Sequence, residues 1–284
     1  MKRRDFTKSS LFIAAQSLGA AASFLALDPA QQAPVSAGQP PSSDWTLIPE
    51  ISDEFSGTSL DLAKWKTETG YPGSGPFAFS PKNVSVSGGR LNLFARKEDL
   101  NGKSYTAAFL ESKISDPGNG SYVEVRARPI DFRANICCAI WEQNFPLQEA
   151  TNPNPEIDIQ EYLLGRIGIP NRVASTLHRW PTKPGVHTMD ATQTHDASVP
   201  LYYDFHTYGL ERRDGKLRFY LDGFKYWEYN VSSMPEFVTM PRHIIFSLEG
   251  HAGNPVDAFL PAAFQIDYLR IYKFIGPSGG SRNP

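Results

Sequence analysis

The sequence predicts an all-β protein in which two antiparallel sheets pack against each other as a sandwich. Short runs of alternating apolar and polar residues, such as Leu91 to Ala95 and Tyr122 to Ala127, are bounded by Gly, Asp or Pro, as β-strands commonly are. No stretch after the first 27 residues keeps a helical period over a dozen positions. Many short antiparallel strands are best accommodated in two packed sheets.

The clearest predicted hairpin lies between residues 217 and 229. Two strand-like runs, Leu217 to Leu221 and Phe224 to Tyr229, are separated by Asp222 and Gly223. Both turn residues readily take positive φ angles, which a two-residue hairpin turn of the common type requires. We therefore expect two adjacent antiparallel strands here.

Residues 1–27 are expected to be an export signal and not part of the fold. Paired arginines, Arg3 and Arg4, precede a largely apolar run from Leu11 to Leu27, an order typical of a twin-arginine signal. Polar residues interrupt the run, and it is short for a membrane-spanning helix of about 20 apolar residues. We expect cleavage, a periplasmic or secreted location in bacteria, and no stable membrane insertion afterwards.

The net charge of the exported chain bears on the class of partner that it can bind. The signal segment holds four basic residues and one acidic residue, so its removal takes the formal net charge from −2 to −5. An acidic chain argues against a nucleic-acid partner.

The domain boundaries follow from composition and length. Residues 28–43, rich in Pro, Gln, Ala, Ser and Gly, are expected to form a disordered linker. Residues 44–276 are expected to form one domain, followed by a flexible tail over residues 277–284.

The two cysteines of the chain, Cys137 and Cys138, are adjacent. Neighbouring strand residues face opposite sides of a sheet, which disfavours a disulfide between them. We expect two small buried apolar side chains and no redox or metal role. The six histidines show no paired helical spacing typical of a zinc site, and no cofactor is expected to be required.

Three closely spaced carboxylates, Glu156, Asp158 and Glu161, carry the strongest functional signal. Glu156 and Asp158 share a strand face by alternation. Glu161 breaks the period, and one inserted residue, a β-bulge near Gln160, would return it to that face. Crowded carboxylates have separated pKa values, which suits an acid beside an ionised nucleophile in glycoside hydrolysis. A retaining glycosidase needs its two carboxyl groups about 5 to 5.5 Å apart, so we expect a concave sheet.

At these positions the sequence resembles glycoside hydrolase family 16, whose bulged signature is Glu-apolar-Asp-x-x-Glu. The resemblance extends from an opening segment, 53–61, through segments 205–211 and 219–223 to a closing segment, 264–272. The family includes laminarinases, agarases and carrageenases. The resemblance implies a concanavalin-like β-jelly roll with a substrate cleft across its concave sheet.

The resemblance also implies roles for the acids and for one aromatic residue. Glu156 would be the nucleophile, Glu161 the acid/base, and Asp158 the residue that holds and tunes the nucleophile. An aromatic at Trp141 would lie in the cleft floor, since aromatic faces stack on sugar rings.

Further candidates for substrate binding come from two other predicted strands. His178 and Trp180 share a face by alternation and are expected to contact the sugar beside the nucleophile, with a packed core pair as the alternative. Glu249 and His251 follow a strand-like run where the family usually lines the cleft. Some family members hold a structural calcium on the convex side, and by resemblance Asp267 is a candidate metal ligand, with a plain surface acid as the alternative.

The sequence departs from the laminarinase pattern at three places. Residues 148–155 lack a Gly-Trp-Pro lead-in, Arg212 and Arg213 follow Glu211 where a tryptophan is usual, and residues 247–250 replace an Asn-containing Gly-Gly segment. These departures make an agar-, porphyran- or carrageenan-type galactan a serious competitor to β-1,3-glucan. Guanidinium groups that meet sulfate through forked hydrogen bonds would support the galactan. The candidates are Arg133, Arg166, Arg172 and Arg179.

The sequence therefore predicts an exported, monomeric, retaining endo-β-glycosidase that acts on a β-linked polysaccharide. The alternative is a lectin-like sandwich that binds polysaccharide without cutting it, because one architecture hosts many functions. The presence of all three acids favours the enzyme, since a binding protein has no need of them.

Overall fold

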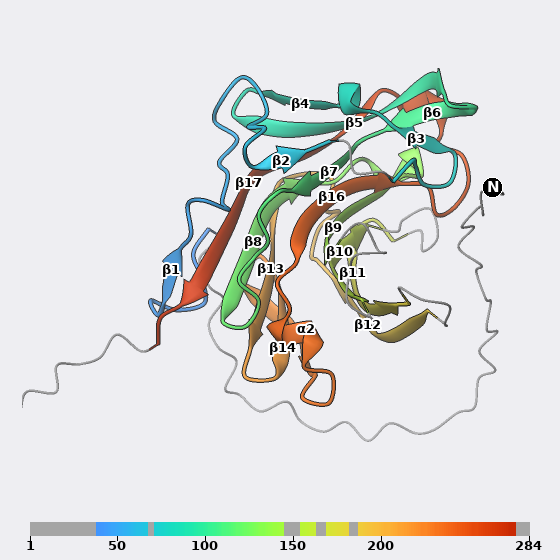
Figure 1. The fold of residues 1–284 in the computed structure, drawn as a ribbon. Helices are drawn as coiled ribbons and strands as arrows, with labels where there is room; N and C mark the ends of the chain where they lie inside the picture. The colour runs from blue at the N-terminus through green and yellow to red at the C-terminus, as the bar shows by residue number, and fades with distance from the viewer. Residues whose placement is uncertain (1–37, 68–70, 145–153, 163–168, 182–186, 277–284) are drawn as a thin grey trace, which may run out of the picture. The chain divides into compact units, whose positions relative to one another are not determined.

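A computed structural model describes residues 38–67, 71–144, 154–162, 169–181 and 187–276 (Figure 1). The predicted signal segment, the predicted tail and most of the predicted linker lie outside these residues. Strands dominate the described part of the chain, so the all-β prediction is confirmed. Within the described ranges, no helix combines the length and apolar character that crossing a membrane requires.

The first sheet contains ten strands among the described residues, and β17 and β8 lie at its centre. Two short strands join it from the side, β1 on β17 and β4 on β5. Its strands, in spatial order and then the two side strands, are β15 (Phe224–Asn230), β14 (Lys216–Leu221), β13 (His206–Arg213), β8 (Ser121–Arg128), β17 (Ala262–Phe274), β5 (Arg90–Leu100), β6 (Lys103–Ala107), β3 (Phe77–Phe79), β1 (Trp45–Leu47) and β4 (Val84–Ser87).

The second sheet contains seven strands among the described residues and carries the predicted acids on β10. Its strands, in spatial order, are β12 (Thr188–Asp196), β11 (Arg172–Trp180), β10 (Asn154–Tyr162), β9 (Cys137–Gln143), β16 (His243–Glu249), β7 (Phe109–Ser112) and β2 (Trp65–Lys66). Strands β9 to β12 and β16 bend along their length, and their concave side is turned away from the first sheet (Figure 1). The expected curvature is therefore present.

The strand pairs are antiparallel as predicted, with the exception of β3 and β6, which pair in parallel. The predicted hairpin joins β14 to β15. Its two turn residues, Asp222 and Gly223, have φ angles of 49° and 76°, the positive values that such a turn requires. Helical structure is limited to short turns: η1 (Pro81–Asn83), η2 (Phe132–Ala134), α2 (Glu236–Thr239) and η3 (Asp257–Phe259).

The main core lies between the two sheets and takes alternate residues from each strand. From β10 it takes Ile157, Ile159 and Tyr162, all of which are at most 1% exposed. Burying such side chains contributes about 1.5 to 3 kcal/mol each. Because a slip of one residue would turn these side chains outwards, their burial fixes which face of β10 carries the acids.

A cluster of four buried charges ties one end of the two sheets together. Arg212 on β13 forms an ion pair with Asp116, and its Nε lies 3.6 Å from Oε2 of Glu142 on β9. Arg242, just before β16, donates to the carbonyl oxygen of Met240 at 3.1 Å. All four charged side chains are at most 1% exposed. Removing one partner from such a cluster typically costs about 3 to 5 kcal/mol, because it leaves an unpaired buried charge.

The variant Glu142→Gln is expected to change how stability depends on pH. Burial, opposed by the nearby Arg212 guanidinium, raises the pKa of Glu142 from 4.5 to about 7. Folding then takes up a proton between these pH values, so this group makes the free energy of unfolding fall as pH rises from about 4.5 to 7. Denaturant titrations at about pH 5 and pH 7 should show a smaller fall in the variant than in the unmodified protein. Equal falls would show that Glu142 ionises near its ordinary pKa.

Candidate active site

Strand β10 presents all three predicted acids on the concave side of the second sheet. Glu156 and Asp158 alternate with Ile157 and Ile159, which lie in the core between the sheets. Glu156 is 7% exposed and Asp158 is 4% exposed, whereas Glu161 is half-buried. The expected common face is therefore formed.

A β-bulge in β10 brings Glu161 to this face. On the neighbouring strand β9, Trp141 and Ile140 are consecutive, but they lie opposite Asp158 and Gln160, so β10 carries one extra residue. The pairing with β11 shifts over the same stretch, between Asp158 and Glu161. The predicted bulge near Gln160 is confirmed, and it re-aims a side chain as bulges beside active sites often do.

Two residues of β11, His178 and Trp180, contact the first two acids. Trp180 donates a hydrogen bond from Nε1 to Oε2 of Glu156 at 2.9 Å. His178 Nε2 lies 3.3 Å from Oδ2 of Asp158. Hydrogen bonds to a buried carboxylate compensate for its lost hydration and fix its orientation. Both side chains therefore lie beside the predicted nucleophile and the acid next to it.

Sequence reasoning missed two residues that extend this network. The ring of His187 stacks on Trp180 at a centroid distance of 3.8 Å, and its Nε2 lies 2.9 Å from Nδ1 of His178. Thr176 donates from Oγ1 to Oε2 of Glu161 at 3.4 Å. Thr176 could have been found by alternation on β11, whereas His187 precedes β12 and no pattern pointed to it.

Trp141 lies on the concave side, but as a packed floor residue. It is 5% exposed and belongs to a small apolar cluster with Phe109, Cys137 and Ile245. Its Nε1 donates to Oγ of Ser247 at 3.0 Å. An aromatic platform for a sugar presents an open ring face, whereas the ring of Trp141 is packed among apolar neighbours.

Glu249 is the centre of a hydrogen-bond network at the end of β16. Its Oε1 accepts from Ser247 Oγ at 2.8 Å and its Oε2 accepts from Ser74 Oγ at 3.2 Å. His251 Nε2 lies 3.3 Å from the same Oε2. Because Ser247 also accepts from Trp141, the network connects the floor of the concave face to its edge.

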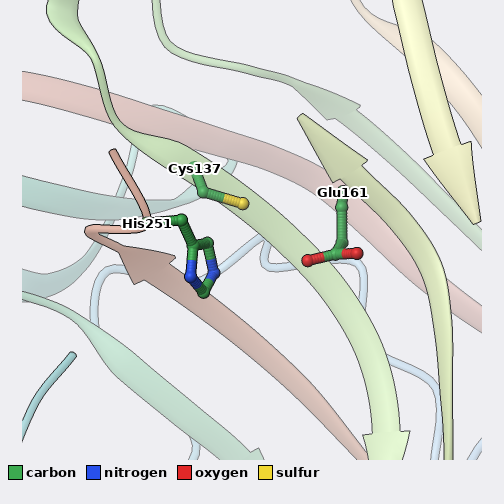
Figure 2. Close-up of side chains that lie close together, drawn as sticks. All are labelled: Cys137, Glu161 and His251. Atoms are coloured by element: carbon green, nitrogen blue, oxygen red, sulfur yellow. The ribbon is translucent and has the colours of Figure 1, made fainter. Parts of the chain in front are cut away.

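Among the described residues, two groups of side chains bring possible metal-ligand atoms close together. One consists of Glu156, Asp158 and His178, and the other of Cys137, Glu161 and His251 (Figure 2). Within each group the donor atoms lie within 4.8 Å of one another. The structural calcium implied by the resemblance would be elsewhere, on the convex side.

The convex side does not fit a calcium site built on Asp267. Its Oδ2 accepts from Arg126 Nη1 at 2.5 Å. Both carboxylate oxygens of Glu54, an acid of the opening segment, accept from Arg270 at 2.7 and 2.9 Å. Calcium requires several oxygen ligands turned toward one point, and here each carboxylate is turned toward a guanidinium group.

Comparison with known proteins identifies the family. The family model described as the GH16 domain of beta-porphyranases A–D matches residues 45–274. The chain belongs to glycoside hydrolase family 16. The family resemblance inferred from the sequence is therefore confirmed, and with it the jelly-roll architecture.

Relatives within family 16 act on several different polysaccharides according to their names. The chain is 28% identical to the beta-glucanase of Rhodothermus marinus, over 97% of this chain and 98% of the relative. It is 26% identical to beta-porphyranase B of Phocaeicola plebeius, over 69% of this chain and 71% of the relative. It spans only 34% of the clotting factor G alpha subunit of Tachypleus tridentatus and 37% of the glucan endo-1,3-beta-glucosidase A1 of Niallia circulans.

The fold also matches solved family 16 structures. The endo-beta-1,3-glucanase from Pyrococcus furiosus superposes with a TM-score of 0.69 at 26% identity, and the match covers 82% of this chain and 96% of that one. The described part of this chain therefore shares its fold with that enzyme.

The variant Trp180→Phe tests the hydrogen bond to Glu156. It keeps an aromatic ring but removes a donor to a carboxylate, an interaction worth about 1.5 to 3 kcal/mol. If that bond orients Glu156 for hydrolysis, the kcat measured on any polysaccharide found to be cleaved should fall by roughly 10-fold to 150-fold, with a much smaller change in KM.

The matched control for this variant is Trp227→Phe, since Trp227 lies on β15 of the other sheet and stacks on Phe219. It should leave kcat within about twofold, as expected for a site away from the acids. Equal losses in the two variants would show that Trp180 has no specific role at Glu156.

Proposed function

We propose that the chain is a retaining endo-β-glycosidase that cleaves a β-linked polysaccharide bound along the concave face. The observation that carries this proposal is the convergence of three acids on that face by way of the bulge in β10. Retaining hydrolysis requires two carboxyl groups at one site, one that attacks the sugar and one that transfers a proton. We assign Glu156 to the first role and Glu161 to the second.

In the first step, a carboxylate oxygen of Glu156 attacks the anomeric carbon and forms a glycosyl-enzyme ester. The glycosidic bond breaks, and the leaving oxygen takes the proton of Glu161. In the second step, Glu161 takes a proton from water, whose oxygen attacks the same carbon and releases Glu156. The two carboxyl groups thus end the cycle in the protonation states in which they began it.

The neighbours of Glu156 suit the role of nucleophile. The indole N–H of Trp180 donates a hydrogen bond to Oε2 of Glu156 and thereby orients this oxygen. Asp158 lies two residues away on the same face and contacts His178. Groups held in place before the reaction need no reorganisation during it, which is a large part of enzymatic rate enhancement.

We propose a galactan of the porphyran or agar class as the substrate, with β-1,3-glucan as the alternative. Support for the galactan comes from the family model that matches, which describes beta-porphyranases, and from the departures in sequence from laminarinases. The proposal does not depend on the arginines first considered for sulfate. Arg133, Arg172 and Arg179 pair with Asp131, Asp196 and Asp190 respectively, and Arg166 lies outside the described residues.

The substrate panel that tests the proposal contains porphyran, agarose, carrageenans, laminarin and mixed-linkage glucan. We expect new reducing ends from porphyran or agarose, and a loss of at least 1000-fold with Glu156→Gln, because an amide is not a competent nucleophile. The control is Glu54→Gln. Glu54 pairs with Arg270 on β17 of the first sheet, so this variant should retain activity.

Release from laminarin alone would contradict the galactan and keep the glycosidase. Binding to one polysaccharide without release from any would contradict the glycosidase and favour a lectin-like protein.

We also propose export by the twin-arginine route to the periplasm or the medium. The paired Arg3 and Arg4 ahead of an apolar run support it. When it is expressed in a bacterial host with its own residues 1–27, the protein should appear outside the cytoplasm, and the double variant Arg3→Lys with Arg4→Lys should accumulate inside. Equal export of both chains, measured by cell fractionation, would contradict the proposal.

A further inference from the structure

A thiol, a carboxylate and an imidazole meet at one edge of the acid-bearing face. Cys137 is on β9, Glu161 is on β10 and His251 follows β16, and their donor atoms all lie within 4.8 Å of one another. Figure 2 shows the three side chains turned toward one common space. Cys137 is buried, whereas Glu161 and His251 are half-buried, so the space is reached from the concave side.

This set of donors matches the preference of zinc. Zn²⁺ takes thiolate, imidazole and carboxylate ligands in a tetrahedron, commonly three from the protein and one open position. Ligand atoms at ordinary zinc bond lengths of about 2.0 to 2.3 Å lie roughly 3.3 to 3.6 Å from one another. Side-chain movements on the order of 1 Å would therefore bring the three donors to bonding distance.

The surroundings of His251 and Cys137 strengthen the match. Glu249 Oε2 lies 3.3 Å from Nε2 of His251, and a carboxylate behind a metal-binding imidazole orients the ring and raises its basicity. Cys137 is directly opposite Glu249 in the pairing of β9 with β16. Strand pairing thus fixes the backbone positions of Cys137 and Glu161, and His251 follows two residues after the end of β16.

We propose that Cys137, Glu161 and His251 form an inhibitory site for Zn²⁺ or a similar thiophilic divalent cation. Binding releases the thiol proton of Cys137 to solvent and forms metal bonds to its sulfur, to one imidazole nitrogen of His251 and to a carboxylate oxygen of Glu161. A metal-bound Glu161 neither delivers nor takes up the catalytic proton. The inhibitory consequence rests on the proposed function, whereas the metal site itself does not.

Binding is tested by calorimetric titration of the metal-free protein with Zn²⁺. We expect one tight site per chain, with affinity at least tenfold weaker in Cys137→Ser and in His251→Asn. The matched control is Cys138→Ala, because Cys138 is the next residue but lies in the core between the sheets. It should bind Zn²⁺ as the unmodified protein does, and unchanged affinity in Cys137→Ser would overturn the site.

A spectroscopic measurement separates this site from the sulfur-free group of Glu156, Asp158 and His178. Co²⁺ in place of Zn²⁺ should give a thiolate-to-metal charge-transfer band in the unmodified protein and in Cys138→Ala. The band should be absent from Cys137→Ser. Loss of the band only in Cys138→Ala, or its absence from all proteins, would contradict metal bonding to Cys137.

Activity is measured for each protein relative to its own metal-free rate. Zn²⁺ should inhibit the unmodified protein, a chelator should restore the rate, and Cys137→Ser should need at least tenfold more Zn²⁺ for the same inhibition. Zn²⁺ that binds through Cys137 without slowing hydrolysis would leave the metal site standing and contradict the acid/base role of Glu161.

Discussion

Strand β10 has to bury an apolar side and present three acids on its other side, and the rest of the second sheet is arranged around that requirement. Ile157, Ile159 and Tyr162 enter the core and fix the register. The bulge beside Gln160 then adds the one residue that brings Glu161 onto the face of Glu156 and Asp158. The bend of the sheet turns this face into a concave surface. A flat and regular strand would satisfy the core equally well, but it would not bring side chains five positions apart toward one substrate.

Burying a carboxylate removes its hydration, and hydrogen-bond donors from neighbouring strands and loops compensate for this loss. Trp180, His178 and Thr176 of β11 contact the acids from one side, and the network of Glu249 lies on the other side. The opposite face of β9 carries its own buried acid, Glu142, within the charge cluster of Arg212. The strands that carry the site are therefore held by polar contacts on both faces, in addition to the apolar core.

Much of this arrangement was predictable because it follows from local periodicity. Alternation placed His178 and Trp180 together, the Asp222–Gly223 pair predicted the hairpin, and the interval between Asp158 and Glu161 predicted the bulge.

Contacts that depend on pairing between distant segments were not predictable. Two examples are Ser74, which donates to Glu249, and His187, which stacks on Trp180; both residues lie in loops. Arg212, noted in the sequence only as a replacement for tryptophan, lies on β13 and pairs with the buried Asp116, which is 96 residues away in the chain. Cys137 was interpreted as a small buried side chain, and only the register of β9 against β10 and β16 shows its place beside Glu161 and His251.

The central claim is that Glu156 and Glu161 act as a retaining pair, and the stereochemistry of the first product tests it most directly. Hydrolysis of the substrate is followed by proton NMR from the first minutes, before the anomers of the new reducing end equilibrate. Double displacement through Glu156 predicts that the β-anomer appears first and that the α-anomer grows in later by mutarotation. Initial formation of the α-anomer would show single displacement by water, and it would contradict the role of Glu156 as nucleophile.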